Sequence, residues 1–204
     1  MAYPPSFSVT KKNALSSNFL TALNNRGTTP VTTVAIKEYG DGRDITTVLT
    51  LTNFVVGALN SAAAALGVGN IVYAFPAGQH LELVYGFSSL SLTAAGTAVT
   101  CKTGLGSVIA SGAVSVLSGT ATFQDRLTAQ DIATAAAGGT AVSALAAATA
   151  GIGTGIALNV AGSVKNVFLN AAGTWNANNV GSLTANGTIV LKWSKMDELG
   201  PYLG

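Results

Sequence analysis

GDGRDITTVLTLTNF, from Gly40 to Phe54, joins a compact cluster of charged residues to a run of threonines and aliphatic residues. In an extended chain successive side chains point to opposite faces. In this run Ile45, Leu49 and Leu51 would therefore point to one face, and Thr46, Thr50 and Thr52 to the other. This alternation predicts a half-buried β-strand with a threonine outer face.

The charged cluster in front of that strand, Asp41-Gly42-Arg43-Asp44, offers two carboxylates and a guanidinium. A calcium loop needs a denser series of acidic ligands and a later glutamate, which the stretch lacks. The paired carboxylates of a glycosidase come from separate elements across a cleft. Glycine accepts a positive φ, so Gly42 suits a turn. We interpret the cluster as a turn and expect any further role of Arg43 and Asp44 to be a contact with another subunit.

The following segments repeat the period of two in short stretches separated by glycine. Leu81, Leu83, Tyr85 and Phe87 are predicted to share one face of a strand, and residues 97–103 to form another. Residues 107–123 are read as two short strands, and Asn186-Gly187 as the turn of a hairpin. Strands at this spacing predict a sandwich or barrel, not alternating β-α units.

The segment 127–156 is harder to interpret. Thr128 followed by Asp131 matches a helix-capping pattern. Five glycines between 138 and 155 make a continuous helix costly, by about 1 kcal/mol each relative to alanine. The pattern therefore predicts a partly helical Ala/Gly-rich loop inserted near 127–156, followed by a strand within 155–162.

No linker divides the chain, so one domain is expected over 36–195, with a tail over 196–204. Residues 1–35 are predicted to be an extended arm because they combine three prolines with polar turn clusters. The arm carries a short apolar patch at Phe19, Leu20 and Leu23. We expect Phe19 and Leu20 to contact a neighbouring subunit or another protein partner.

The composition of the 204 residues indicates a surface that is covered in the native state. Charged residues make up 9%, apolar residues 49%, and the mean hydropathy is +0.47. So few charges solvate a monomer poorly, which favours an oligomer or a larger assembly. The net charge is +2 and the basic residues form no stripe, so no nucleic-acid partner is expected. The uncharged run between Asp131 and Lys165 has too few large aliphatic residues to predict a membrane span.

No catalytic, cofactor or metal site is expected from the sequence. The single histidine, His80, has only Glu82 beside it on the predicted strand face, and two donors do not make a metal site. The chain has no GxSxG motif, and its glycine-rich stretches match neither a dinucleotide nor a phosphate loop. Cys101 has no partner for an internal disulfide and is read as a small buried residue.

Five segments, taken in their order and spacing, resemble head decoration (cement-type) proteins of tailed bacteriophages, especially small virion proteins of marine phages. They are TTVLTLTNF, VYAFPAGQHLELVYGFSSLSLT, GLGSVIASGAVSVLSGTATFQDRLTAQD, VFLNAAGTWNA and ANGTIVLKWS, and the resemblance covers most of residues 31–195.

The resemblance implies an all-β fold: a jelly-roll-like antiparallel β-sandwich with an extended N-terminal arm. It also implies a structural, non-enzymatic virion protein that is made in the host cytoplasm. Such a protein would assemble as a trimer on the outer capsid surface and bind the major capsid protein. The alternative is a trimeric fibre or knob that binds a receptor or glycan, with Trp175, Tyr85 and Tyr73 available for sugar stacking. Core or interface packing is the competing reading for those three aromatics.

Overall fold

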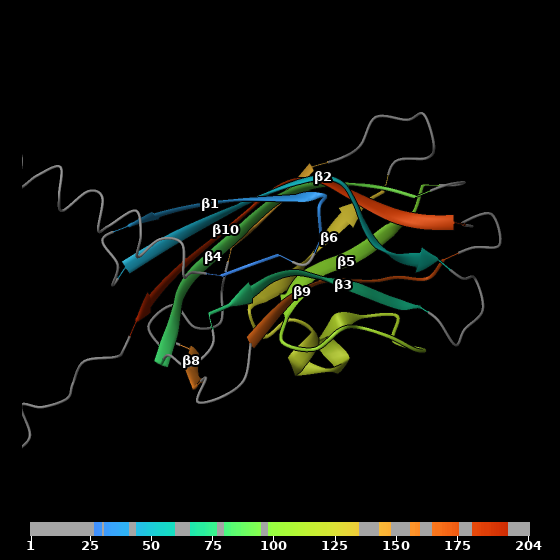
Figure 1. Cartoon of the computed structure of the whole chain (residues 1–204). Coiled ribbons are helices and arrows are strands. Elements are labelled where there is room, and N and C mark those ends of the chain that lie inside the picture. Colours follow the sequence, from blue (N-terminus) through green and yellow to red (C-terminus); the bar gives the residue numbers. More distant parts are fainter. Residues whose placement is uncertain are drawn as a thin grey trace, which may run out of the picture.

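A computed structural model shows an all-β sandwich, as predicted, built from antiparallel strands (Figure 1). The structure describes residues 27–29, 31–40, 44–59, 66–76, 80–94, 98–134, 143–147, 156–159, 165–175 and 181–195. Within these ranges there are ten strands, two short 3-10 turns and no α-helix. Phe19, Leu20, Arg43 and the tail lie outside the described residues.

Strands account for most of the described chain. They are β1 (Val34–Gly40), β2 (Asp44–Leu59), β3 (Gly67–Phe75), β4 (His80–Thr93), β5 (Thr100–Gly106), β6 (Leu127–Ala133), β7 (Ser143–Ala147), β8 (Ile156–Asn159), β9 (Lys165–Ala172) and β10 (Gly181–Lys195). The 3-10 turns η1 (Leu117–Gly119) and η2 (Ala121–Phe123) lie between β5 and β6.

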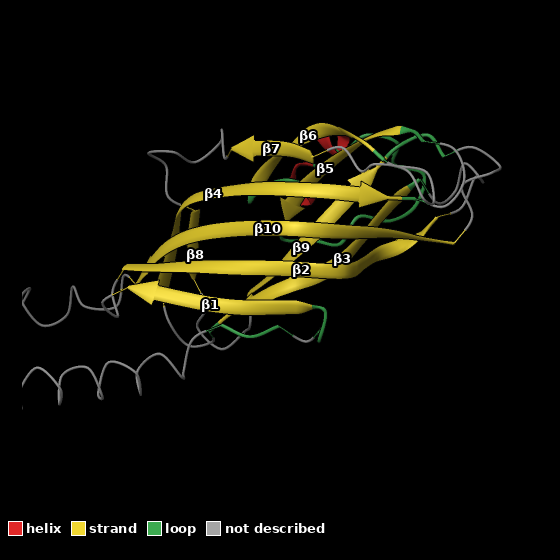
Figure 2. Ribbon diagram, turned by 90° about the horizontal axis from the view of Figure 1, so that it is seen from above, coloured by secondary structure: helices red, strands yellow, loops and turns green. Residues whose placement is uncertain are grey.

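The described strands form two sheets. The long sheet has the order β1-β2-β10-β4-β7, with β8 also pairing β4, and the short sheet has the order β3-β9-β5-β6 (Figure 2). Successive strands change sheet at β2 to β3, β3 to β4, β4 to β5, β6 to β7, β8 to β9 and β9 to β10. This places β2-β10-β4-β7 against β3-β9-β5-β6, which is the double Greek key of a jelly roll.

β2 has the two-faced character that its sequence predicts, with one irregularity. Ile45, Leu49 and Leu51 are buried, while Thr50 and Thr52 are exposed. The pairing with β10 shifts register after Leu51, where Asn53 adopts a positive φ of 49°. An extra residue in one strand reverses which side chains face inward. Phe54 and Val56 are therefore buried although their parity differs from that of Leu51.

The prediction that four residues of this strand share one face is right for Leu81 and Leu83 and wrong for Tyr85 and Phe87. Leu81 and Leu83 are buried, but Tyr85 is 38% exposed and Phe87 is half-buried. Lys192 pairs with Tyr85 and Trp193 with Leu83, so Val84 is an additional residue in β4. This bulge turns Tyr85 outward and keeps Leu90 and Leu92 in the core.

Asn186-Gly187 is not a hairpin turn, contrary to the prediction. β10 continues through it, paired with β2 on one side and β4 on the other. Gly187 takes a φ of 133°, and a Cβ there would meet the Ser89 carbonyl oxygen at 2.2 Å. The glycine therefore allows close strand approach opposite the β2 bulge. At that bulge the Asn186 amide oxygen accepts a hydrogen bond from Asn53 N at 2.8 Å.

The predicted loop at 127–156 is wrong at its start, because Leu127–Ala133 is strand β6. This segment pairs with β5, matching Cys101 with Ile132, and it buries Leu127 and Ile132 in the main core. Tertiary burial of these two aliphatic residues outweighs the local capping pattern. β7 and β8 interrupt the rest of the segment, and β8 lies within the strand expected over 155–162.

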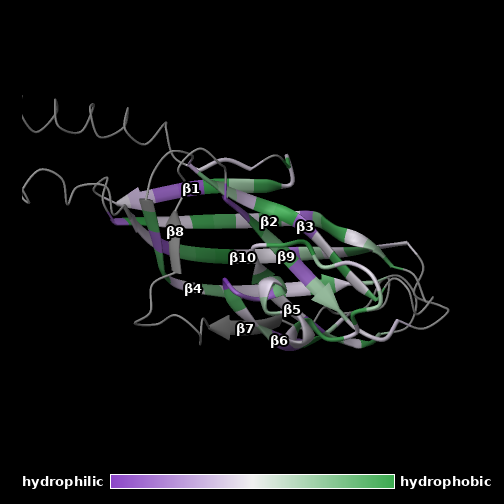
Figure 3. Cartoon of the chain, turned by 90° about the horizontal axis from the view of Figure 1, so that it is seen from below, coloured by the Kyte–Doolittle hydropathy of each residue, from purple (hydrophilic) through white to green (hydrophobic). Residues whose placement is uncertain are grey.

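Residues 107–123 form an irregular covering segment and not two short strands. Within it, Ala110, Leu117 and Phe123 form a second small core with Ala172 of β9, on the outer side of the short sheet (Figure 3). Asn170 of β9 holds this segment: its side chain accepts from Ala110 N at 2.8 Å and donates to two carbonyl oxygens, those of Val108 and Phe123, at 2.8 and 2.9 Å.

The described end of the predicted arm belongs to the domain. Thr28 and Ala74 exchange two backbone hydrogen bonds, at 3.0 and 2.8 Å, which extends the free edge of β3. Gly27 lies so close to the Tyr73 ring that a Cβ would meet it at 2.0 Å. Gly27 and Thr28, at the end of the predicted arm, therefore contact β3.

A buried polar cluster joins the two sheets at Thr47. Trp193 of β10 donates its indole N–H to Thr47 Oγ1 at 2.8 Å, and Thr47 donates to Glu38 Oε1 of β1 at 3.1 Å. Tyr73 of β3 donates its hydroxyl to the same carboxylate oxygen at 2.7 Å. Burial, and then the charge of Glu38, raise the pKa of Tyr73 well above its ordinary value. Each buried donor of the cluster has an acceptor, as a stable interior requires.

Replacing Thr47 with valine keeps the shape of the side chain and removes the hydroxyl oxygen that accepts the Trp193 N–H. We expect Thr47→Val to lower the free energy of unfolding by about 1–3 kcal/mol, because the buried donor is then unsatisfied. The matched control is Thr50→Val, the same change at an exposed site in the same strand, which should cost less than about 0.5 kcal/mol. Equal losses in urea unfolding would show that the cluster does not stabilise the fold.

Candidate functional site

The two sheets differ in how their outer faces are covered. Residues 107–126 pack over the outer side of the short sheet, so much of that surface is interior. Among the described residues, none forms a comparable cover over the outer face of β1, β2, β10 and β4, which retains exposed side chains such as Lys37, Thr50 and Lys192. We name this surface the long-sheet face and treat it as the candidate site.

Strand register sets the long-sheet face out in rows. Reading across β1, β2, β10 and β4, three consecutive rows are Tyr39-Thr46-Lys192-Tyr85, Lys37-Val48-Val190-Phe87 and Ala35-Thr50-Thr188-Ser89. All twelve side chains are exposed or half-buried. The first row is aromatic and basic, the second is aliphatic apart from Lys37, and the third carries mainly hydroxyl groups, so ten of the twelve side chains are uncharged.

Charge gathers at one end of the face, where β2 begins. Asp44 and Glu82 lie on either side of Ser194, and Ser194 Oγ donates a hydrogen bond to Asp44 Oδ1. Lys192 lies one row further along. The structure thus places Asp44, a residue expected to make a contact, on the long-sheet face. The corresponding expectation for Arg43, Phe19 and Leu20 falls outside the described residues and stays a prediction.

Three aromatic residues were possible sugar-stacking positions, and only one is accessible. Trp175 is 3% exposed, with its indole N–H donated to the Leu66 carbonyl oxygen at 3.0 Å, and Tyr73 is fully buried. Both are core residues. Tyr85 is accessible and packs on Phe87 with ring centroids 6.2 Å apart. Tyr39, at the far end of the same row, is 56% exposed and was not singled out from the sequence.

The chemistry of the long-sheet face suits packing against another protein surface. Threonine and serine hydroxyls both donate and accept hydrogen bonds, so they pair with a backbone or a side chain of either polarity. Val48, Val190 and Phe87 supply apolar area between them, and Lys37 and Lys192 supply two positive charges. Among the described residues, no three His, Cys, Asp or Glu side chains come together as a metal site would require.

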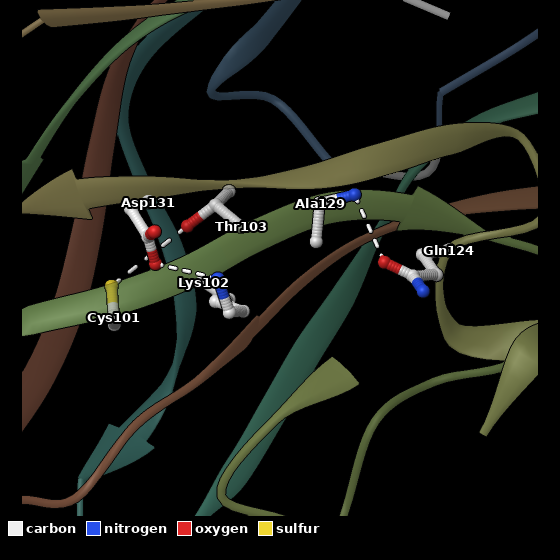
Figure 4. Close-up of polar contacts among 6 residues, drawn as sticks. All are labelled: Cys101, Lys102, Thr103, Gln124, Ala129 and Asp131. Carbon is white, nitrogen blue, oxygen red and sulfur yellow. Dashed lines mark hydrogen bonds and ion pairs between the residues drawn. The ribbon is translucent and has the colours of Figure 1, made fainter. Parts of the chain in front are cut away.

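Several polar side chains on and beside β5 and β6 have partners (Figure 4). Lys102 Nζ lies 2.7 Å from Asp131 Oδ1 across the strand pair, and Gln124 Oε1 accepts from Ala129 N at 3.0 Å. Cys101 Sγ lies 3.9 Å from Thr103 Oγ1 in the interior. Burial raises the pKa of the Cys101 thiol from 9.0 to about 11. The Lys102–Asp131 pair thus joins β5 to β6, and Cys101 lies in the interior.

No known protein family, curated protein or solved structure matches the chain. In the described part of the chain, no helix has the length and apolar character to cross a membrane.

The raised pKa of Cys101 predicts how stability depends on pH. The folded state binds the thiol proton more tightly than the unfolded state, so this contribution is complete below pH 9 and is lost as pH rises through about 11. We expect the free energy of unfolding of the wild type to fall more steeply than that of Cys101→Ala between pH 9 and 11. The difference accumulated over that interval should be on the order of 2 kcal/mol. Parallel pH curves in urea unfolding would contradict the assignment.

Proposed function

We propose that this chain is a structural virion protein that decorates a phage capsid from outside and stabilises it. In this proposal the protein binds the major capsid protein, as a trimer, and has no catalytic role. The observation that carries it is the long-sheet face: an accessible sheet face on which hydroxyl, aliphatic and aromatic side chains outnumber the charged ones. Such a face gains more from contact with another protein surface than from solvation.

Two further features support the proposal. The whole chain carries 9% charged residues, which favours a protein whose surface is shared with neighbours. The jelly roll is also a frequent fold of capsid and lectin domains, although that likeness bears on fold and only by analogy on function. The resemblance of five ordered segments to head decoration proteins agrees with both.

A fibre or knob that binds a receptor or glycan is the second candidate. The exposed aromatic residues at the two ends of one row, Tyr39 and Tyr85, favour it, because sugars stack on such rings. Each ring is next to a hydroxyl or a lysine that offers a hydrogen bond. Substitution of Tyr85 by alanine separates the two functions, since it removes a stacking platform and leaves the threonine rows intact.

A charge placed in the centre of the long-sheet face tests the proposed contact. We expect Thr50→Glu to leave the melting temperature nearly unchanged and to reduce binding to capsids of the cognate major capsid protein at least tenfold. The physical reason is that a carboxylate at a closed protein contact must be desolvated without a partner. The measurement is co-sedimentation with the capsids. Thr174→Glu, the same change at an exposed position after β9, should bind normally; equal binding by both variants would exclude the face as the contact.

Removal of residues 1–26 tests the role of the arm. The cut is placed there because Gly27 and Thr28 pack on and pair with β3. We expect the truncated protein to keep its oligomeric mass and its unfolding midpoint but to lose capsid attachment, since an extended arm would bind by backbone pairing. A truncated protein that coats capsids as densely as the full chain would show that the arm is dispensable.

A further inference from the structure

Asn186-Gly187 is the one Asn-Gly pair in the chain, and it lies within strand β10. An asparagine before a glycine is chemically labile, because glycine has no Cβ to hinder attack of its backbone nitrogen on the preceding side-chain amide. Such pairs are favoured in tight turns, and here the pair is part of a central strand. Its chemical fate therefore depends on how the neighbouring strands hold it.

The pairing of Asn186 differs on its two sides. Toward β4 it lies opposite Ser91, whose Oγ donates to the Asn186 carbonyl oxygen at 3.4 Å. Toward β2 the register passes from Ala185 directly to Gly187, so no residue of β2 is the register partner of Asn186. The bulge in β2 thus interrupts the ladder at this residue.

The side chain of Asn186 takes the place of the interrupted ladder contact. Its amide oxygen accepts a hydrogen bond from Asn53 N at 2.8 Å, and its Nδ2 donates to Asn53 Oδ1 at 3.4 Å. Asn53 is exposed and holds a positive φ of 49°, while Asn186 is half-buried. Two bonds to one bulge residue therefore fix the amide that the Gly187 nitrogen would attack.

We propose that Asn186 is a site of spontaneous deamidation and that its two hydrogen bonds to Asn53 restrain the reaction. The Gly187 nitrogen forms a bond to Asn186 Cγ and gives up its proton, the bond from Cγ to Nδ2 breaks, and that nitrogen leaves as ammonia. Water then opens the succinimide ring at either carbonyl and leaves aspartate or isoaspartate at position 186. The proposal does not depend on the proposed function.

Two features of the fold oppose the attack. The succinimide ring needs a backbone ψ at Asn186 that an extended strand does not have. Rotation of the amide also has to break both of its bonds to Asn53. The reaction therefore requires β10 to separate from β2 at the bulge. Local openings of this kind need less free energy than global unfolding, and a ladder that a bulge already interrupts is where they are expected.

The two products differ in their effect on the sheet. Aspartate keeps an oxygen that can accept from Asn53 N, and it adds a negative charge to the long-sheet face. Isoaspartate routes the main chain through the former side chain, so β10 becomes longer by one atom. That extra atom disrupts the register of β10 with both neighbouring strands. Deamidation would thus alter the charge of the face or the pairing of the central strand.

Peptide mass spectrometry of the full chain tests the site. The wild type, Asn53→Ala and Thr52→Ala are incubated at mildly alkaline pH, folded and in unfolding urea, and conversion of the amide at position 186 is followed with time. All three chains should react at the same rate in urea. The folded wild type should react at least about tenfold more slowly than the unfolded chain, because only the open fraction reacts.

The two variants test the role of the bulge residue. Folded Asn53→Ala should react roughly five- to tenfold faster than the folded wild type, since alanine lacks the amide acceptor and is strained at a positive φ. Thr52→Ala, the same change at the exposed neighbouring residue, should keep the wild-type rate. Should Asn53→Ala fail to fold, Asn53→Gly replaces it and should react about twofold faster, because glycine accepts the positive φ and only the side-chain acceptor is lost.

Three results would overturn the proposal. The first is a folded wild type that reacts as fast as the unfolded chain, and the second is an amide at position 186 that does not react in urea. The third is a folded variant at position 53 that reacts no faster than Thr52→Ala.

Discussion

The pairing of β10 between β2 and β4 is the interaction on which the rest of the structure depends. β10 runs from Gly181 to Lys195 and pairs with both neighbours along its length. Its alternate residues Leu183, Ala185, Ile189, Leu191 and Trp193 are buried, which fixes the inner face of the whole sheet. The intervening residues form the central column of the long-sheet face. A slip of one residue would exchange the two faces, so core and surface are specified together.

Period-two alternation was enough to predict the fold class and the outer threonines of β2. It was not enough to locate the bulges, because a bulge is stabilised by a partner strand distant in sequence. Tyr85 and Asn186 were misplaced for this reason: both readings assumed unbroken local geometry. β6 was mistaken for the start of a loop because its helix-capping pattern is local, while the burial of Leu127 and Ile132 depends on β5 and the opposite sheet.

The candidate site was only partly predictable. The threonine face was predicted, and Asp44 was assigned to a contact. The long-sheet face needs four strands in register, however, and the alternation read in β4 put Tyr85 and Phe87 on the wrong face. Glu38 and Thr47 gave no signal in sequence, since an acidic residue and a threonine in a strand are ordinarily expected at the surface. Their burial follows from the position of Tyr73 and Trp193, which belong to strands far away in the chain.

The interior and the surface of this sandwich have opposite chemical characters. The side chains of the inner polar cluster are hydrogen-bonded to one another and join the two sheets. The long-sheet face instead presents hydroxyl and aliphatic side chains that point outward. The central claim is that this face serves assembly on a capsid shell. Imaging of the assembled particle by electron cryomicroscopy tests it most directly: the account predicts hundreds of copies over the shell, with the β1-β2-β10-β4 face against the capsid protein or a second copy. A few copies confined to the tail, or that face free in solvent, would contradict it.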